Sequence, residues 1–201
     1  MDIGVFIFDT DYSINISELA RELEERGYES LFVPEHTHIP TSRRSPFPGG
    51  GELPKQYSHT LDPFISLGFA AASTKNLKIG TGICLLPQRD PIVTAKSIAS
   101  LDLMSKGRFV LGLGGGWNVD EMENHGVTYK TRFAMMKEHV LAMKSLWVDE
   151  QAEFHGEYIN FDKSWAYPKP VQKPYPPILM GGETAVSYTH LRAHETLRYI
   201  G

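Results

Sequence analysis

Short apolar runs alternate along this chain with segments whose apolar residues recur at helical spacing. The run at residues 3–8, IGVFIF, predicts a buried strand, because a short continuous apolar run is typical of one. The next segment carries Ile16, Leu19, Ala20 and Leu23 on one face of a helix. The same reasoning predicts further strands at 30–33, 77–86, 108–114 and 176–182, further helices at 61–74, 89–107 and 129–150, and a hairpin within 152–172, with Gly156 near its turn.

Cap residues support the boundaries of these helices. Asn15 and Glu18 resemble a capping box, and Gly27 stands where a C-terminal cap belongs. The dipeptides Asp62-Pro63 and Asp90-Pro91 each place a side-chain acceptor at the N-cap and a proline at the first helical position, where its missing N–H costs nothing. Cap chemistry therefore supports three of the helix starts that periodicity predicts.

The alternation of strands and helices predicts a parallel α/β sheet, either a closed barrel or an open doubly wound sheet. The open dinucleotide-binding fold needs a glycine fingerprint directly after the first strand, and FDTDYSINIS contains no glycine. The glycines at 112–116 follow the fourth strand, and Trp117 occupies the last glycine position of the fingerprint. The pattern therefore favours the barrel, in which functional groups lie at the C-terminal ends of the strands.

Composition and charge narrow the class of protein. The 201 residues are 41% hydrophobic and 22% charged, as in ordinary globular domains, and the length allows one domain or two small ones. A formal net charge of -4 without a basic run gives no footprint for nucleic acid. Cys84 is the only cysteine, which excludes an intramolecular disulfide. The chain shows no signal-peptide pattern and no apolar run near the roughly 20 residues of a membrane span, so we expect a cytoplasmic protein that does not bind membranes.

The stretch LFVPEHTHIP, residues 31–40, holds the first candidate chemistry. His36 follows the second predicted strand, at the rim where barrel active sites form, and an imidazole there can hydrogen-bond a cofactor or transfer a proton near pH 7. A loop histidine satisfied by the backbone is the alternative. A metal pair of His36 and His38 needs further ligands at other strand ends, and those ends read CLLP, GGGWN and MGGE, so no metal site is predicted.

Three glycine-containing runs lie at later strand ends. Gly80-Thr81-Gly82 marks either a bulge with close approach of a ligand or a tight strand-to-helix connection. Residues 114–116 would leave the backbone open to a flat ligand with Trp117 as a wall, unless they form a flexible turn beside a core tryptophan. Gly181-Gly182 would offer backbone N–H groups to an anion at a helix start. The proline- and glycine-rich stretch 34–59 is long enough that we expect it to be functional or disordered.

These motifs together resemble one family. The segments ESLFVPEHTHIP, LKIGTGICLLPQRDPIVTAKSIASLDLMSKGRFVLGLGGGWNVDEMENHGV and PKPVQKPYPPILMGG are similar to the bacterial luciferase-like monooxygenase superfamily, most of all to its deazaflavin (coenzyme F-420) dependent oxidoreductases. The resemblance covers about residues 1–183. It implies an α/β fold, a (β/α)8 TIM barrel with a flavin-like ring at its C-terminal rim. Five strands are predicted here, so we expect a partial barrel with about the first five strands of eight.

The resemblance also implies roles for individual positions. His36, with Glu35 beside it, would face the redox ring and the substrate. A non-prolyl cis peptide in a bulge at the third strand would fall at Gly82-Ile83. The cofactor-binding positions that it implies are Thr81, Gly82, Ile83, Gly116, Trp117 and Asn118 around the ring, and Gly181 and Gly182 at the phosphate. The sugar-phosphate dehydrogenases of the superfamily have a carboxylate near the position of Trp117, so the tryptophan puts that substrate in doubt.

The activity implied is hydride transfer between reduced coenzyme F-420 and a small organic substrate in the intact parent protein. Because the family is often dimeric, the resemblance also implies a homodimer for the full-length protein. An FMN-dependent two-component monooxygenase is the alternative within the superfamily, and a non-catalytic truncated fragment is a third interpretation. From Thr184 the sequence leaves the family pattern, and VSYTHLRAHETLRYIG resembles a translated sequencing adapter at the end of a metagenomic gene fragment. We therefore expect residues 184–201 to be a non-native tail, with a genuine C-terminal helix as the alternative.

Overall fold

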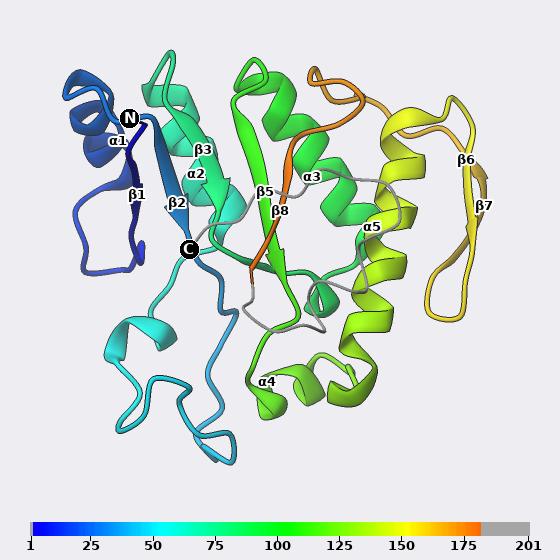
Figure 1. The fold of residues 1–201 in the computed structure, drawn as a ribbon, viewed down its shortest axis with the longest axis horizontal. Helices are drawn as coiled ribbons and strands as arrows, with labels where there is room; N and C mark the ends of the chain where they lie inside the picture. The colour runs from blue at the N-terminus through cyan, green and yellow to red at the C-terminus, as the bar shows by residue number, and fades with distance from the viewer. Residues whose placement is uncertain (1, 182–201) are drawn as a thin grey trace.

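The computed structural model describes residues 2–181, and its central feature is a parallel sheet (Figure 1). The main strands in spatial order are β1 (Gly4–Phe6), β2 (Ser30–Val33), β3 (Lys78–Thr81), β5 (Phe109–Gly114) and β8 (Ile178–Met180). The short strand β4 (Cys84–Leu85) pairs with the last residues of β5, whereas β3 pairs with its first residues. The fold is the predicted partial (β/α)8 barrel, and a strand lies within each of the five predicted ranges, although the third range, 77–86, is divided into β3 and β4.

Helices connect the strands, as parallel pairing requires. The main helices are α1 (Ile16–Glu25), α2 (Pro63–Ser73), α3 (Pro91–Met104) and α5 (Arg132–Val148), with a short helix α4 (Val119–Asn124) directly after β5. Single 3-10 turns occur at η1 (Lys55–Ser58), η2 (Leu86–Gln88) and η3 (Tyr129–Thr131). In Figure 1, α2 and α3 lie behind the sheet, and α2 contacts β3 while α3 contacts β5. The long predicted helices are confirmed, and α4 was not predicted.

The predicted N-caps at Asn15, Asp62 and Asp90 are confirmed, since each side chain accepts a backbone hydrogen bond at the start of its helix. The Asp62 carboxylate accepts hydrogen bonds from the backbone N–H groups of Phe64 and Ile65, at 2.9 and 3.1 Å, and Asp90 accepts one from Val93 at 2.7 Å. Each aspartate precedes a proline at the start of its helix, so the two helices start by the same device.

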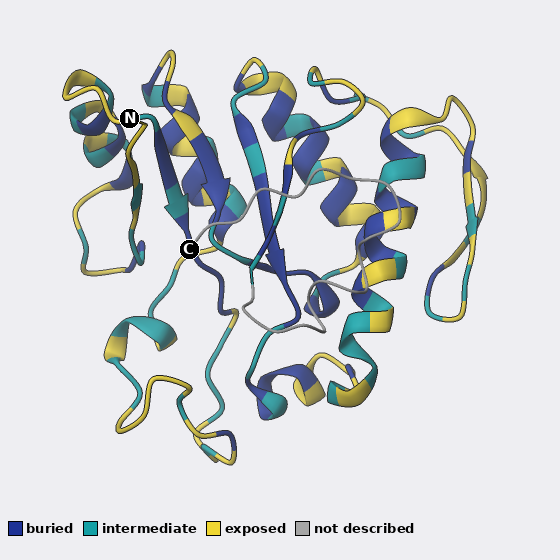
Figure 2. Cartoon of the chain, viewed as in Figure 1, coloured by how far each residue is buried: buried dark blue, intermediate teal, exposed yellow. Residues whose placement is uncertain are grey.

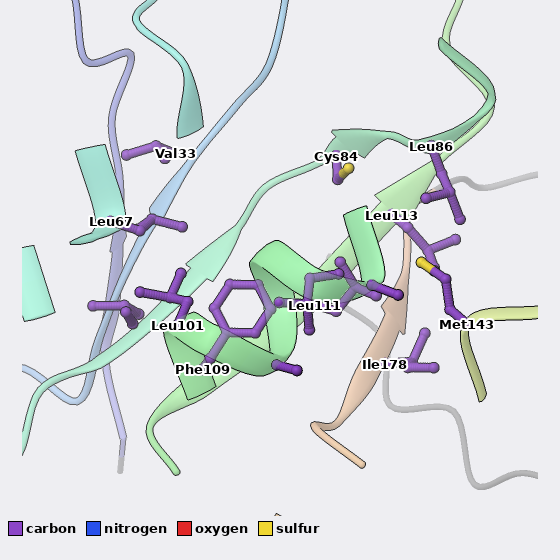
Figure 3. Packing of buried hydrophobic residues seen from close by; sticks show 14 of the residues in the cluster. Val33, Leu67, Cys84, Leu86, Leu101, Phe109, Leu111, Leu113, Met143 and Ile178 are labelled. Atoms are coloured by element: carbon purple, nitrogen blue, oxygen red, sulfur yellow. The ribbon is translucent and has the colours of Figure 1, made fainter. Parts of the chain in front are cut away.

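The core lies between the sheet and the helices. Phe109, Leu111 and Leu113 alternate along β5, and all three side chains are fully buried (Figure 3). Most of β5 is accordingly coloured as buried in Figure 2. They pack within one cluster that includes Ile98 of α3 and Met143 of α5. Burying a leucine or phenylalanine side chain stabilises a fold by about 1.5–3 kcal/mol. Because β5 contributes to the core along its whole length, the position at which it ends, and where α4 begins, is firmly fixed.

The predicted hairpin is confirmed as β6 (Ala152–His155) and β7 (Asn160–Ser164), which pair antiparallel beside α5 (Figure 1). A carboxylate of α5 holds its turn, because Glu138 accepts hydrogen bonds from three successive backbone N–H groups, those of residues 157–159, at 2.7 to 3.1 Å. The predicted tail, residues 184–201, lies outside the described residues.

Candidate active site

His36 lies three residues after the C-terminal end of β2, and its side chain is almost completely buried. Its Nδ1 lies 2.8 Å from Oε2 of Glu121, a residue of α4 whose side chain is fully buried. A carboxylate only accepts, so Nδ1 carries the hydrogen of this bond and Nε2 remains as the second ring nitrogen. Glu121 therefore fixes both the orientation and the tautomer of the imidazole.

Aromatic rings surround the imidazole. The ring centroid of His36 lies 5.4 Å from that of Tyr57 in η1 and 5.8 Å from that of Trp117, which follows β5. Phe47 of the long loop contacts both, at 5.2 Å from Tyr57 and 6.3 Å from Trp117. Burial raises the pKa of the Tyr57 hydroxyl above its ordinary value, because the phenolate loses solvation. The imidazole thus lies in a pocket whose walls are largely apolar, and Trp117 forms part of one wall.

The long loop, residues 34–59, is ordered by contacts with α4. The Asp120 carboxylate accepts hydrogen bonds from the Ser42 hydroxyl and from the backbone N–H of Arg44, the latter at 3.1 Å. The Arg44 guanidinium forms an ion pair with Glu123 at 2.5 Å. The Ser42 hydrogen bond lowers the pKa of Asp120 most, against desolvation, and the Arg44 amide and guanidinium lower it further. The alternative of a disordered loop is therefore wrong.

His38 belongs to these contacts between the long loop and α4, and not to the pocket around His36. Its Nε2 lies 2.9 Å from the side-chain nitrogen of Asn124, and its Nδ1 lies 2.9 Å from the Thr37 hydroxyl. The same hydroxyl lies 2.7 Å from Nε2 of His125. Within residues 2–181, no group of three or more histidine, cysteine, aspartate or glutamate side chains is placed to hold a metal ion.

Glu35 does not share the pocket contacts of its neighbour. One carboxylate oxygen accepts a hydrogen bond from the backbone N–H of Leu85 at 2.7 Å, and the other forms an ion pair with Arg89 at 2.5 Å. Arg89 also pairs with Asp62, the N-cap of α2. Desolvation by burial lowers the pKa of Arg89, but the Glu35 carboxylate beside the guanidinium outweighs it and raises this pKa above its ordinary value. Glu35 therefore connects β2, β4 and α2.

The peptide bond between Gly82 and Ile83 is cis, as the resemblance implied. The Ile83 side chain lies against the following strands: a Cβ atom added to Gly114 would sit 2.1 Å from its Cδ1, and one added to Gly181 would sit 2.8 Å from its Cγ2. Next to this cis peptide, the buried Thr81 hydroxyl donates to the carbonyl of Gly112 at 2.6 Å. These glycines therefore make room for the chain's own side chains and backbone.

The same holds for the rest of the glycine run. A Cβ atom at Gly115 would lie 2.9 Å from the ring of Phe133, and one at Gly116 would lie 2.6 Å from the terminal methyl of Met122. The space that side chains at these glycines would occupy is thus already filled, so the expectation of an open face is wrong there. Contact between Gly116 and a cofactor ring stays a prediction. The Gly181 N–H donates to the Leu113 carbonyl at 2.9 Å, so a free amide there is also wrong. Gly182 lies outside the described residues.

Several buried polar atoms near these strand ends have no hydrogen-bond partner within residues 2–181. Asn118 caps α4 through its Oδ1, while its buried Nδ2 has no partner. Oε1 of Glu121 and both side-chain polar atoms of Gln88 are also buried without partners. Gln88 follows β4 and its Nε2 lies close to Gly116. Buried amides of this kind are normally hydrogen-bonded, so they suit a polar ring placed at these strand ends.

Sequence reasoning missed Gln88 and Glu121. For Glu121 a signal was present, because Asn118-Val-Asp-Glu121 has the spacing of a capping box and so predicts a helix start. In the structure Asn118 is the N-cap, and the Glu121 side chain turns to His36. For Gln88 the sequence carries no such signal.

The comparisons with known proteins agree with this architecture. A family model described as luciferase-like monooxygenase matches residues 1–190. The chain belongs to the luciferase-like monooxygenase family. A protein of Mycobacterium tuberculosis, described only as uncharacterized, is 45% identical over 184 residues, which cover 90% of this chain and 65% of that protein.

Two further relatives represent two reaction classes within the family. An F420-dependent glucose-6-phosphate dehydrogenase of Kineococcus radiotolerans is 28% identical over 86% of this chain and 48% of its own length. The crystal structure of the monooxygenase RslO1 from Streptomyces bottropensis superimposes with a TM-score of 0.76 at 26% identity, covering 90% of this chain and 53% of that one. The family member described here therefore spans about half to two thirds of the length of these relatives. Within residues 2–181, no helix is long and apolar enough to span a lipid bilayer.

Proposed function

We propose that the intact parent protein is an oxidoreductase that transfers a hydride between coenzyme F-420 and a small organic substrate. The observation that supports it most is the buried His36, whose Nδ1 is held by Glu121 at 2.8 Å and whose ring contacts Trp117. A buried imidazole with one nitrogen fixed has its other nitrogen available as proton donor or acceptor. The F420-dependent relative supports the choice of cofactor.

Five residues of the candidate site act together in the proposed reaction. The deazaflavin, when bound, supplies the hydride chemistry. Nε2 of His36 gives or takes the proton that accompanies it, and Glu121 keeps that nitrogen in the required tautomer. The unpaired amides of Asn118 and Gln88 would hold polar edges of the ring. Trp117, whose ring lies 5.8 Å from that of His36, would cover one side of the imidazole.

Around the ring, Gly82-Ile83, Thr81 and Gly116 remain proposed cofactor positions, with Ile83 packed against the later strands. Glu35 receives a different task from the one expected. Because its carboxylate is fully engaged by Arg89 and the Leu85 amide, we assign it to holding β2 against β4, and His36 alone to proton transfer.

FMN-dependent monooxygenation is the second candidate, favoured by the likeness to the monooxygenase RslO1. Thermal melting of the chain with F-420 or with FMN separates the two. A ligand at about 100 times its Kd stabilises a protein by about 2.7 kcal/mol, so binding gives a measurable shift. We expect F-420 to raise the melting temperature and FMN to leave it unchanged. A shift with FMN alone favours the monooxygenase, and no shift with either favours a non-catalytic fragment.

Turnover tests the role of the histidine. In the intact parent protein, His36 is replaced by alanine, and kcat and cofactor Kd are measured together. General acid–base catalysis contributes about 100- to 10,000-fold, so kcat should fall by that order while Kd changes little. An unchanged kcat would show that the imidazole is a bystander.

A further inference from the structure

A cavity of about 530 Å³ lies within the long loop beside the aromatic rings around His36. Its apolar lining includes Phe47, Leu53 and Pro54, and its charged lining consists of Arg43, Glu52 and Lys55. Small-molecule sites commonly have this size and this mixture of apolar walls with few charges. The cavity adjoins the pocket through Phe47, which contacts Tyr57 and Trp117.

Neither cation of this cavity, Arg43 or Lys55, forms an ion pair within residues 2–181, but of the two only Arg43 has a buried nitrogen without a hydrogen-bond partner. Its guanidinium carbon lies 6.0 Å from the ring centroid of Trp117. Its Nη1 is buried without a hydrogen-bond partner, and no carboxylate in residues 2–181 lies within ion-pair distance of it. Its neighbour Arg44 behaves in the opposite way, with Asp120 at 3.2 Å and Glu123 at 2.5 Å. Burying part of a guanidinium without an anion is costly, so the pattern calls for an external anion.

The backbone holds Arg43 in place. Its φ is 46°, in the left-handed region that side chains other than glycine rarely adopt. The residues on both sides, Ser42 and Arg44, are hydrogen-bonded to Asp120 of α4, and the Arg43 N–H donates to the carbonyl of Pro40 at 3.4 Å. The side chain is therefore presented to the cavity from a fixed position, with Trp117 beneath its guanidinium.

We propose that this cavity binds a small organic acid whose carboxylate pairs with Arg43 and whose apolar body lies along Phe47 and Trp117. A guanidinium matches a carboxylate with two parallel hydrogen bonds, which gives both orientation and affinity. Because Trp117 contacts both the guanidinium and the His36 ring, an acid bound in this way extends toward the imidazole. That the acid is the substrate rests on the proposed function; that it binds at Arg43 does not.

The test measures binding of phenylacetate and its neutral amide, phenylacetamide, to the chain without any redox cofactor, by tryptophan fluorescence and calorimetry. A charged hydrogen-bonded pair makes the acid bind about tenfold tighter than the amide. In Arg43→Gln the two ligands should bind equally, and Arg43→Lys should retain part of the preference. Lys55→Gln removes the same charge from the same cavity and should keep the preference. Melting temperatures confirm that each variant is folded.

Three results overturn the proposal. The first is equal binding of acid and amide by the wild type, or no binding of either. The second is an equal loss of the preference for the acid in Lys55→Gln and in Arg43→Gln, which would mean that the overall positive charge of the cavity attracts the acid. The third comes from FMN and riboflavin: if Arg43→Gln erases a preference for FMN and leaves phenylacetate unaffected, Arg43 serves a cofactor phosphate. Because no turnover is measured, failure of the hydride-transfer proposal leaves this result unchanged.

Discussion

Replacing Glu121 tests the contact that orients the candidate catalytic imidazole. In Glu121→Leu the side chain keeps a similar volume but loses both oxygens, so Nδ1 of His36 is left buried without its acceptor at 2.8 Å. Both side chains are almost fully buried, at 6% and 0% exposure, so solvent does not replace the lost partner. A hydrogen bond to a charged group contributes about 1.5–3 kcal/mol, and we expect the free energy of unfolding to fall by that amount.

Glu121→Gln is the matched control, because its amide oxygen still accepts from Nδ1 and only the charge is lost. We expect a cost of about 1 kcal/mol or less for it. Urea unfolding followed by tryptophan fluorescence gives the free energies, and ¹⁵N NMR of the histidine ring reports which nitrogen of His36 carries the hydrogen. The leucine variant should show a mixed tautomer and the glutamine variant the wild-type one. Wild-type stability together with a wild-type tautomer in Glu121→Leu would refute the reasoning.

Two further predictions concern other parts of the fold. In Gly112→Ala the new Cβ would lie 2.0 Å from the backbone oxygen of Thr81, so the variant should lose its cooperative unfolding transition in urea. The matched variant Gly68→Ala in α2, whose new Cβ meets no atom within 4 Å, should instead gain up to about 1 kcal/mol in free energy of unfolding. Glu24 is desolvated, which opposes ionisation, but backbone N–H groups of residues 75–77 lower its pKa below 4.5. Its stabilisation is therefore complete above that pH and is lost as pH falls through the folded-state pKa. Glu24→Gln should thus lose about 1 kcal/mol at pH 7, and the difference from wild type should close in melting curves below about pH 4.5.

Local sequence patterns were sufficient for the regular elements of the fold. The strands at β2 and β5 follow from continuous apolar runs, and the starts of α2 and α3 follow from an aspartate followed by a proline. Each of these signals involves residues within one turn or one strand. Burial and hydrogen bonding within such short spans depend little on the rest of the chain, so they can be read without the structure.

The contacts of the candidate site depend on pairs far apart in the chain. His36 was a candidate from its position after a strand, but its partner Glu121 is 85 residues away. Glu35 was expected beside it, but its carboxylate is held by the Leu85 amide and by Arg89, which are 50 and 54 residues away along the chain. The glycines at 114–116 looked open to a ligand because the side chains that fill the space beside them come from other elements.

The separation of His36 from Glu121 also sets an order of events during synthesis. A ribosome adds about 5–20 residues per second, so the glutamate is made about 4–17 s after the histidine that it orients. During that interval β1, β2 and α1 can already assemble, but the imidazole has no acceptor and the long loop has no helix to hold it. The contacts that hold the loop and the imidazole can therefore form only after α4 has been made, so this site is not completed before residue 124 has been added.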